Sequence, residues 1–451
     1  MGSRFLRLLW ESAGETKKGL VKVVDNLPIF VVADDLTGAA DAANYFRTET
    51  YRVRITFDSQ TPWMFSLGPN VVQVFDAETR SLAEPDAAKR VVSAGEQVSR
   101  ALPQGFRVYK KIDSTLRGHV GSEIAALLRG LRRRIALLAP AFPANGRTVL
   151  DGILFVDGIP ISQTAFARDP RSPVTEDTIS KILRNTSDLP VIHLGREVVS
   201  QGSAAIAQFL DSVSKNMAIV VADAVTDADL ASLAGAVADS QDILPCGSAG
   251  LAKQLAAFWV NAEEPGVVES DGQMPVCDCV LVAVGSANPV AHAQLAYVAG
   301  ELGVPVVEIH PALLSSPVTH EKELKRAKDE LLHEPHRIIG VTLSEKRSER
   351  DPAIPGSFED DLAQVVYHWF TQVSQQAKSR TIGFVVTGGD TALALCKTLS
   401  ATAIWPRGEV VPGMPWSLVE TPHGDILMVS KAGGFGNMNA LEKAVGFLTN
   451  H

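Results

Sequence analysis

The sequence predicts an α/β fold of two domains, each a mostly parallel sheet flanked by helices. Short apolar runs rich in β-branched residues alternate along the chain with Ala- and Leu-rich stretches of helical spacing. A chain of 451 residues is too long for one ordinary core. Residues 261–275 are acidic and rich in Pro and Gly, which is typical of a linker. We therefore expect domains over residues 1–260 and 276–451.

The expected strands are the apolar runs themselves. In chain order they are Ile29–Ala33, Val71–Phe75, Ile135–Ala139, Val191–Leu194, Ala218–Val221, Cys279–Val284, Val304–Ile309, Ile338–Leu343, Ile382–Val386 and Ile426–Val429. Stretches such as Ala204–Val213 and Leu230–Ala238 have helical spacing. Because parallel strands are joined by crossover connections, which are usually helices, this alternation places helices on both faces of each sheet.

Composition and charge argue against several classes of protein. The formal net charge is −9, whereas binding to nucleic-acid phosphates needs a basic surface, so no nucleic-acid partner is expected. No apolar run approaches the roughly 20 residues of a membrane helix, so no membrane partner is expected either. Residues 1–24 lack the continuous apolar region of a signal peptide. We expect a cytoplasmic protein.

The four cysteines are too scattered to form a disulfide framework. Cys277 and Cys279 have a spacing that could begin a metal site, but no second pair of Cys or His lies near them in sequence. Alternation would place both thiols on one face of a strand over Val276–Val284. We expect structural thiols and no protein-bound metal site.

Charged residues follow the first two strands of the N-terminal part. Asp34 and Asp35 come directly after the first strand, where open α/β sheets bind ligands, and two adjacent carboxylates exceed what capping a helix needs. Arg80 lies in a polar loop past the second strand. Its guanidinium could clamp a carboxylate, or it could equally pair on the surface with Glu78 or Glu84.

A third segment, over residues 109–118, packs two Lys, an Asp, two hydroxyls and an Arg into a junction between strand and helix. An ordinary helix start accounts for Ser114 but not for Lys111 together with Asp113. This density of groups that bind small anions indicates a ligand site. The Pro-, Gly- and Asn-containing segment 139–147 is interpreted equally as a loop over that site or as a surface excursion.

Residues 382–399 predict a phosphate-binding unit in the C-terminal part. An apolar strand is followed by Gly388 and Gly389, and Asp390 and Thr391 then open a helix. Such a unit places unpaired backbone N–H groups and the positive end of a helix dipole at one point. On an acidic protein, an anion must be held by local geometry of this kind.

Two further loops in the C-terminal part repeat this logic. Ser286 follows the strand Cys279–Val284, and Gly433 and Gly434 follow the last strand, where they let the backbone approach a ligand closely. A Walker A loop and a G-x-G-x-x-G fingerprint are both absent from the sequence. The loops therefore favour a phosphate site of another kind.

Together these motifs resemble the four-carbon acid sugar kinase family. They occur in the family's order as Asp34–Gly38, Lys111–Gly118, Ala139–Gly146, Asp151-Gly152, Gly247–Leu251, Gly285-Ser286, Thr387–Thr391 and Lys431–Gly436. The resemblance runs from about Ile29 to about Phe447. Each motif alone is modest, but the ordered set is specific.

The resemblance implies an enzyme, an ATP-dependent kinase that phosphorylates threonate, erythronate or a 3-oxo-tetronate at the terminal 4-hydroxyl. The N-terminal domain would bind the sugar acid and the C-terminal domain the nucleotide. By motif, the substrate would contact Asp35, Arg80, Lys111, Ile112, Asp113 and Ser114. ATP would contact Ser286, Gly388, Gly389, Asp390, Thr391 and either Gly433 or Gly434.

The chemistry of these side chains agrees with that implication. Arg80 and Lys111 can bind the carboxylate of a tetronate, and Asp35 or Asp113 can accept the proton of the attacking hydroxyl. Phosphoryl transfer needs mainly positioning and charge neutralisation, with Mg²⁺ bridging phosphate oxygens. Closure of the two domains must bring hydroxyl and γ-phosphate together. Monomer and homo-oligomer remain open alternatives.

Two other functions compete with the kinase. An NAD(P)-dependent sugar-acid oxidoreductase would lack the usual dinucleotide glycines. A non-catalytic sugar-acid sensor would have no need of both carboxylate segments and all three glycine loops. Turnover should depend on Asp35 and Gly389 in a kinase, whereas a sensor should keep its ligand response when Gly389 is changed.

Overall fold

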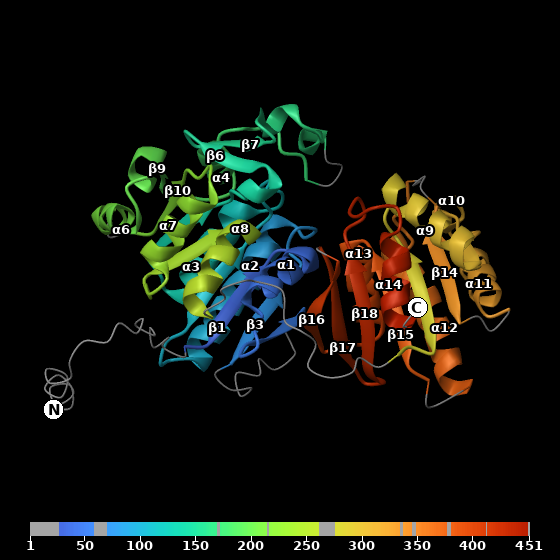
Figure 1. The fold of residues 1–451 in the computed structure, drawn as a ribbon. Coiled ribbons are helices and arrows are strands. Elements are labelled where there is room, and N and C mark those ends of the chain that lie inside the picture. The colour runs from blue at the N-terminus through green and yellow to red at the C-terminus, as the bar shows by residue number, and fades with distance from the viewer. Residues whose placement is uncertain are drawn as a thin grey trace, which may run out of the picture.

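Figure 1 shows the computed structural model of the chain. It describes residues 27–57, 70–168, 172–213, 216–260, 276–333, 337–344, 349–376, 380–411 and 413–449. The N-terminal segment and the predicted linker over residues 261–275 lie outside the described residues. The described residues before and after that linker form two halves that lie side by side, and the predicted α/β fold is confirmed.

The N-terminal half contains a parallel sheet whose described strands have the order β2-β3-β1-β4-β11-β5-β10-β9. Helix α1 packs on α8, whereas α2 packs on α3. The strands are β1 (Ile29–Ala33), β2 (Arg52–Thr56), β3 (Val71–Asp76), β4 (Arg107–Lys111), β5 (Ile135–Ala139), β9 (Val191–Leu194), β10 (Ala218–Ala222) and β11 (Ile243–Gly247). The helices are α1 (Leu36–Phe46), α2 (Glu84–Ala101), α3 (Val120–Leu131), α4 (Ile179–Arg184), α5 (Arg196–Val199), α6 (Ser203–Ser212), α7 (Asp227–Val237) and α8 (Ala249–Trp259).

The C-terminal half has parallel strands in the order β13-β14-β12-β15-β18, and the antiparallel strands β17 and β16 extend that sheet. Helix α9 packs on α14, and α12 packs on α11 and α13. The strands are β12 (Cys279–Val284), β13 (Val306–Ile309), β14 (Ile338–Leu343), β15 (Ile382–Thr387), β16 (Ala403–Val411), β17 (Met414–Thr421) and β18 (Gly424–Lys431). The helices are α9 (Pro289–Leu302), α10 (Pro311–Leu314), α11 (His320–Leu331), α12 (Phe358–Gln376), α13 (Gly389–Thr398) and α14 (Ala440–Thr449).

The two sheets join edge to edge, which the sequence did not predict. Strand β16 pairs antiparallel with β2 through Ile404 and Ile55, so 15 described strands form one sheet. Beside this pair, the guanidinium groups of Arg52 and Arg54 lie 5.7 and 5.9 Å from the ring centroid of Trp405. The junction therefore combines an apolar pair with cation–π contacts.

Trp405→Leu should weaken this junction. The substitution removes both cation–π contacts and the hydrogen bond that Trp405 Nε1 donates to Glu420 at 3.1 Å. We expect a loss of about 1–2 kcal/mol in the free energy of unfolding. Urea denaturation would measure it, with Val318→Ala as control because Val318 is 77% exposed. An unchanged midpoint would show that the stacked arginines contribute nothing to the junction.

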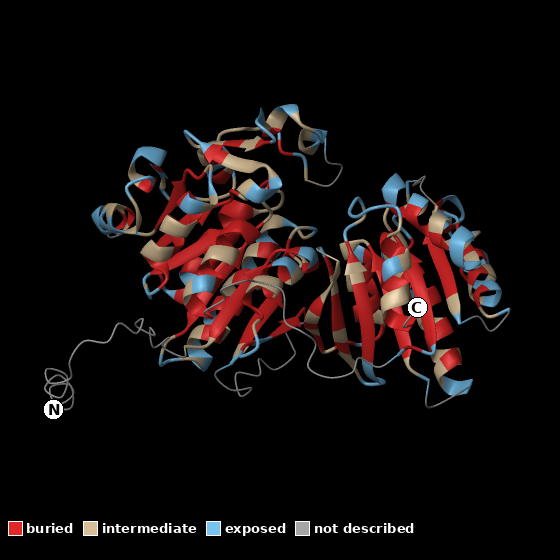
Figure 2. Ribbon diagram, in the orientation of Figure 1, coloured by how far each residue is buried: buried red, intermediate tan, exposed pale blue. Residues whose placement is uncertain are grey.

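Buried strands form the interior of both halves, and exposed residues concentrate on the outer helices and loops (Figure 2). One apolar cluster runs through the N-terminal half, crosses the junction at Ile404 and covers one face of the C-terminal sheet. A second cluster fills the opposite face, under α9 and α14. The halves thus share one core across the joined sheet.

Two details differ from the sequence-based expectation. The expected loop 139–147 leads directly into strands that were not expected: β6 (Arg147–Leu150) pairs with β7 (Ile153–Val156), which pairs with β8 (Ile159–Pro160), in a small antiparallel sheet. Cys277 and Cys279 do not share a face, because β12 begins only at Cys279 and the two buried thiols belong to different apolar clusters.

Candidate active site

Each half has a crevice where two neighbouring strands send their chains to opposite faces of the sheet. In the N-terminal half β1 leads into α1 and β4 leads towards α3, and these helices lie in different layers. In the C-terminal half β12 leads towards α9 and β15 into α13, again in different layers. Ligands of open α/β sheets bind at such points, beyond the carboxyl ends of the strands.

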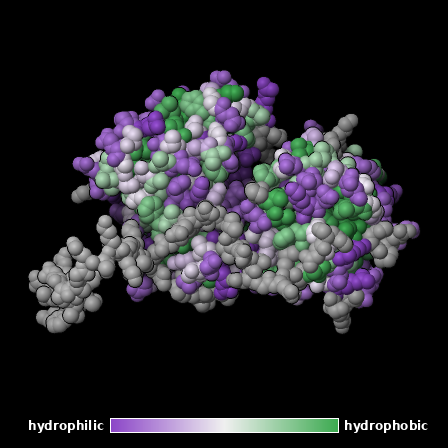
Figure 3. Space-filling view, viewed as in Figure 1, coloured by the Kyte–Doolittle hydropathy of each residue, from purple (hydrophilic) through white to green (hydrophobic). Residues whose placement is uncertain are grey.

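Both crevices open into one cavity of about 610 Å³, which we call the interdomain cavity. The surface is hydrophilic where the two lobes meet (Figure 3). From the N-terminal half the cavity is lined by Asp34, Asp35, Thr37, Arg80, Lys111, Asp113 and Arg117. From the C-terminal half it is lined by Ser286, Gly388, Gly389, Asp390, Thr391 and Gly433, among others. The structure therefore brings most of the predicted site residues together.

Arg80 joins the two adjacent carboxylates. Its Nη1 donates to Asp35 at 2.6 Å, while Nη2 and Nε donate to Asp34 at 2.8 and 3.1 Å. Asp113 lies 3.9 Å from Nη2. The alternative of a surface pair between Arg80 and Glu78 or Glu84 is therefore wrong: the guanidinium organises the floor of the cavity.

The two carboxylates differ in their electrostatics. Burial raises the pKa of Asp34, but Arg80 and the nearby lysines outweigh that effect, and the net pKa lies below its usual value. Burial also raises the pKa of Asp35, Arg80 opposes it and the charge of Asp34 adds to it, so the net pKa lies above its usual value. Of the two, Asp35 is the better proton acceptor near neutral pH.

Asp35 also begins helix α1. Its extended backbone and its Oδ1, which accepts from Gly38 N at 2.8 Å, make it the N-cap. A Cβ at Gly38 would lie 2.8 Å from both Asp35 Oδ1 and Lys111 Nζ. Glycine is thus required where carboxylate and ammonium converge on the first turn of the helix.

Two lysines end β4, and their environments separate their roles. Lys110 is fully buried and pairs with Glu123 of α3 at 2.9 Å, which fixes the strand to that helix. Lys111 lines the cavity, and its Nζ donates to Ile112 O at 3.0 Å. One ammonium group is therefore structural and the next is placed for a ligand.

Asp113 is held by many donors. It accepts from Arg117 Nε and Nη2 at 2.9 and 3.0 Å, and from the backbone and hydroxyl of Thr115. Although burial raises its pKa, the bonds from Arg117 and the charge of Arg80 hold the pKa well below its usual range. A carboxylate so stabilised binds hydroxyl groups well but accepts protons poorly.

The glycine loops of the C-terminal half meet each other closely. Gly388 has φ +108°, which favours glycine, and it is the N-cap of α13. A Cβ at Gly285 would lie 2.0 Å from Thr391 Oγ1, and a Cβ at Gly433 would lie 2.1 Å from Ser286 Oγ. Only glycine lets these loops pack so closely beside the first turn of α13, which lines the cavity.

The first turns of α1 and α13 touch across the cavity. A Cβ at Gly389 would lie 2.3 Å from Thr37 Oγ1. Nearby, Lys397 of α13 donates to the Glu78 carboxylate of the other half. In this conformation the carboxylate cluster and the glycine loops are already adjacent.

Three predicted residues do not line the cavity. Ile112 is buried at 1% exposure, and neither Ser114 nor Gly434 is among the lining residues. Conversely, Arg117 and Thr37 line it, although neither was singled out as a ligand. Both residues belong to motifs recognised in the sequence. The sequence therefore indicated the segments that form the site, but not which side chains of each segment point into the cavity.

No group of three or more His, Cys, Asp or Glu side chains placed to hold a metal ion occurs in the described part of the chain. None of the described helices is long and apolar enough to cross a membrane.

The chain resembles known proteins along almost its whole length. Residues 29–255 match a family described as a sugar-binding N-terminal domain, and residues 281–441 match one described as a nucleotide-binding C-terminal domain. A D-threonate kinase of Cupriavidus necator is 32% identical, over 91% of this chain and 95% of its own. A D-erythronate kinase of Heliobacterium modesticaldum is 27% identical, over 93% and 97%. A 3-oxo-tetronate kinase of Brucella melitensis is 26% identical, over 92% and 94%.

The fold is also found in a solved structure. A Salmonella typhimurium LT2 protein superimposes with a TM-score of 0.73 at 23% identity, covering 93% of this chain and 98% of that one. At this identity the match supports the two-domain α/β architecture.

Proposed function

The chain belongs to the four-carbon acid sugar kinase family, and from that premise we propose that it transfers the γ-phosphoryl group of ATP to the terminal 4-hydroxyl of a four-carbon sugar acid. One observation carries the proposal: a single cavity is lined by a carboxylate and guanidinium cluster from one half and by phosphate-binding glycine loops from the other. Residues 1–260 would bind the sugar acid and residues 276–451 the nucleotide.

The sugar acid would lie on the floor of the interdomain cavity. Arg80 and Lys111 supply positive charge for its carboxylate. Asp35 and Asp113 supply acceptors for its hydroxyls, and the bonds from Arg117 fix Asp113 in place. Ile112 and Ser114 do not line the cavity, and as chain neighbours of Lys111 and Asp113 they would help to position those two side chains.

Asp35 is the proposed general base. Its raised pKa lets it hold the proton of the attacking hydroxyl, whereas the depressed pKa of Asp113 does not. Its side chain is 27% exposed and lines the cavity. The first turn of α13 lies opposite, so a hydroxyl at Asp35 faces the place where the γ-phosphate would be held.

The nucleotide phosphates would lie against Ser286, Gly388–Thr391 and Gly433. Backbone N–H groups and the α13 dipole favour anions there. Mg²⁺ usually keeps several waters and binds through one or two carboxylates together with substrate phosphates. The carboxylates of Asp390 and Glu359 border the cavity and could serve in that way, and the ion would neutralise charge on the phosphates.

A kinetic panel tests the function. We expect ADP release only when ATP, a divalent cation and one of threonate, erythronate or a 3-oxo-tetronate are present together, and loss of turnover when EDTA removes the cation. A coupled assay of ADP and NMR of the product, which should carry phosphate on O4, would measure both. No turnover across all stereoisomers would refute the proposal, and reduction of NAD(P)⁺ instead would favour an oxidoreductase.

A further inference from the structure

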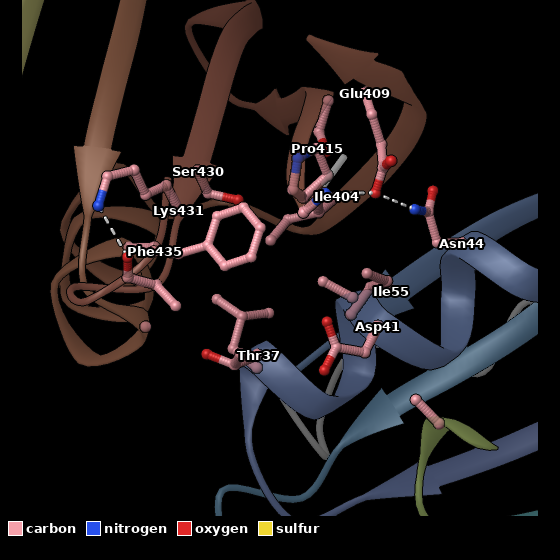
Figure 4. A pocket seen from close by; sticks show the side chains of 18 of the residues that line it. Thr37, Asp41, Asn44, Ile55, Ile404, Glu409, Pro415, Ser430, Lys431 and Phe435 are labelled. Atoms are coloured by element: carbon pink, nitrogen blue, oxygen red, sulfur yellow. Dashed lines mark hydrogen bonds between the residues drawn. The ribbon is translucent and has the colours of Figure 1, made fainter. Parts of the chain in front are cut away.

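A second cavity of about 500 Å³ adjoins the first and has no role in the chemistry proposed above. It lies between α1 of the N-terminal half and strands β16, β17 and β18 of the C-terminal half (Figure 4). The two cavities share wall residues, which are Leu36, Thr37, Asp41, Gly388, Gly389 and Ala432. A molecule bound at the glycine loops could therefore extend from one cavity into the other.

Apolar and aromatic groups dominate this second cavity. Ile55, Ile404 and Met428 line it, and the rings of Tyr45 and Phe435 border it. Phe435 projects into the space in Figure 4, and it is 42% exposed although it is a large hydrophobic residue. An exposed ring beside an apolar wall is suited to stacking on a flat heterocycle.

Carboxylates outnumber cationic groups among the residues that line the second cavity. Asp41 and Glu409 face it from opposite halves, and Asn44 donates to Glu409 at 2.5 Å. Lys431 also lines it, but its Nζ donates to the carbonyls of Ala432 and Gly433 at 2.8 and 3.1 Å. A sugar acid or a phosphate group would meet carboxylates here, whereas a neutral ring bearing an amine would find acceptors.

We propose that the second cavity holds the base and ribose of the nucleotide whose phosphates lie at the glycine loops. This inference rests on the proposed kinase function. The base would stack on Phe435, and an exocyclic amine would donate to Asp41 or Glu409. Hydroxyls of Ser417 and Ser430 line the cavity as further hydrogen-bonding groups. The nucleotide would thus span both cavities, with its neutral end in the second and its charged end in the first.

Calorimetric titration with ADP, IDP and pyrophosphate tests the proposal, because IDP has a carbonyl in place of the exocyclic amine of ADP, and pyrophosphate lacks both base and ribose. Phe435→Ala should weaken ADP binding about tenfold and leave pyrophosphate binding unchanged. IDP, which lacks the amine, should bind the unmodified protein several-fold more weakly than ADP. Met438→Ala is the matched control, since Met438 lies three residues on, is 53% exposed and lines neither cavity.

A blocking variant gives an independent measurement. Ser430→Phe fills the second cavity and should abolish ADP binding while pyrophosphate still binds, and Ser430→Ala, which loses only a hydroxyl, should weaken ADP binding far less than Ser430→Phe. The proposal would be overturned if Phe435→Ala and Ser430→Phe both bound ADP as tightly as the unmodified protein. It would also be overturned if a variant lost affinity for ADP and for pyrophosphate to the same extent.

The same measurements separate this inference from the kinase function. Turnover of tetronates with unchanged ADP affinity in both cavity variants would leave the function intact and reject the nucleoside site. If ADP binding depended on Phe435 but no tetronate was turned over, the nucleoside site would be supported and the kinase function rejected. A protein that binds no ADP would reject both.

Discussion

Asp35→Asn should lower kcat by about 10²–10⁴-fold with little change in thermal stability. Asparagine caps helices about as well as aspartate, so α1 keeps its first turn, and Arg80 keeps its bonds to Asp34 although it loses the one to Asp35. Steady-state kinetics with saturating ATP and sugar acid would measure kcat, and differential scanning fluorimetry would check the fold.

Asp113→Asn is the informative comparison. Asp113 accepts several bonds from Arg117 and Thr115, so its substitution should disturb substrate binding and raise KM more than it lowers kcat. If Asp35→Asn kept its kcat while Asp113→Asn lost most of it, the base would be Asp113 and the assignment made from pKa would be wrong.

The acid limb of the pH profile follows from the same assignment. Asp35 must be ionised to accept a proton, and its pKa is raised by burial, so kcat/KM should fall as pH is lowered through that raised value. Asp113 has a depressed pKa and stays ionised over the same range. Its contribution to stability is present above its unfolded pKa and is lost only as pH falls further towards its folded value. In Asp35→Asn the acid limb of the residual activity should therefore disappear.

Continuous apolar strands were predictable, whereas strands that contain charged residues or proline, such as β2, β4, β11 and β16, were not. Strands such as β12 and β14 are continuous apolar runs because helices cover both faces, and their bounds match the prediction. Strand β2 reads Arg-Val-Arg-Ile-Thr, and β16 contains a Trp, a Pro and a charged pair, so neither has that signature. These two strands join the halves, and this is why the single sheet was missed.

The site was predictable as a set of segments but not as a set of contacts. From the sequence, Asp35 could be either a helix cap or a ligand group. In the structure its carboxylate caps α1 and also lines the interdomain cavity. The partner of Arg80 could not be chosen between local glutamates and distant groups, because Asp34 and Asp35 lie 46 and 45 residues away. Ion pairs between residues so far apart in the sequence can be predicted only when the strand order is known.

The choice between Gly433 and Gly434 can be settled by two alanines. Gly433→Ala places a Cβ 2.1 Å from Ser286 Oγ and 2.9 Å from its Cβ, so the two phosphate-binding loops must separate. Gly434→Ala meets Asn288 Nδ2 at 2.8 Å, the amide end of the side chain whose Oδ1 caps α9, so a smaller shift is needed there than at Gly433. We expect kcat/KM for ATP to fall about 100-fold or more in the first variant and less than about threefold in the second.

A double variant shows whether the cause is steric. Ser286→Gly removes both atoms that the new methyl group would strike, at the cost of one hydroxyl. If crowding separates the loops, Gly433→Ala with Ser286→Gly should be less impaired towards ATP than Gly433→Ala alone, a non-additivity that contacting residues produce. If the double variant is worse than either single one, Gly433 acts through its own backbone approach to the phosphates rather than through its packing on Ser286. Equal losses in the two alanine variants would instead mean that the whole turn after β18, and not one glycine in it, holds the nucleotide.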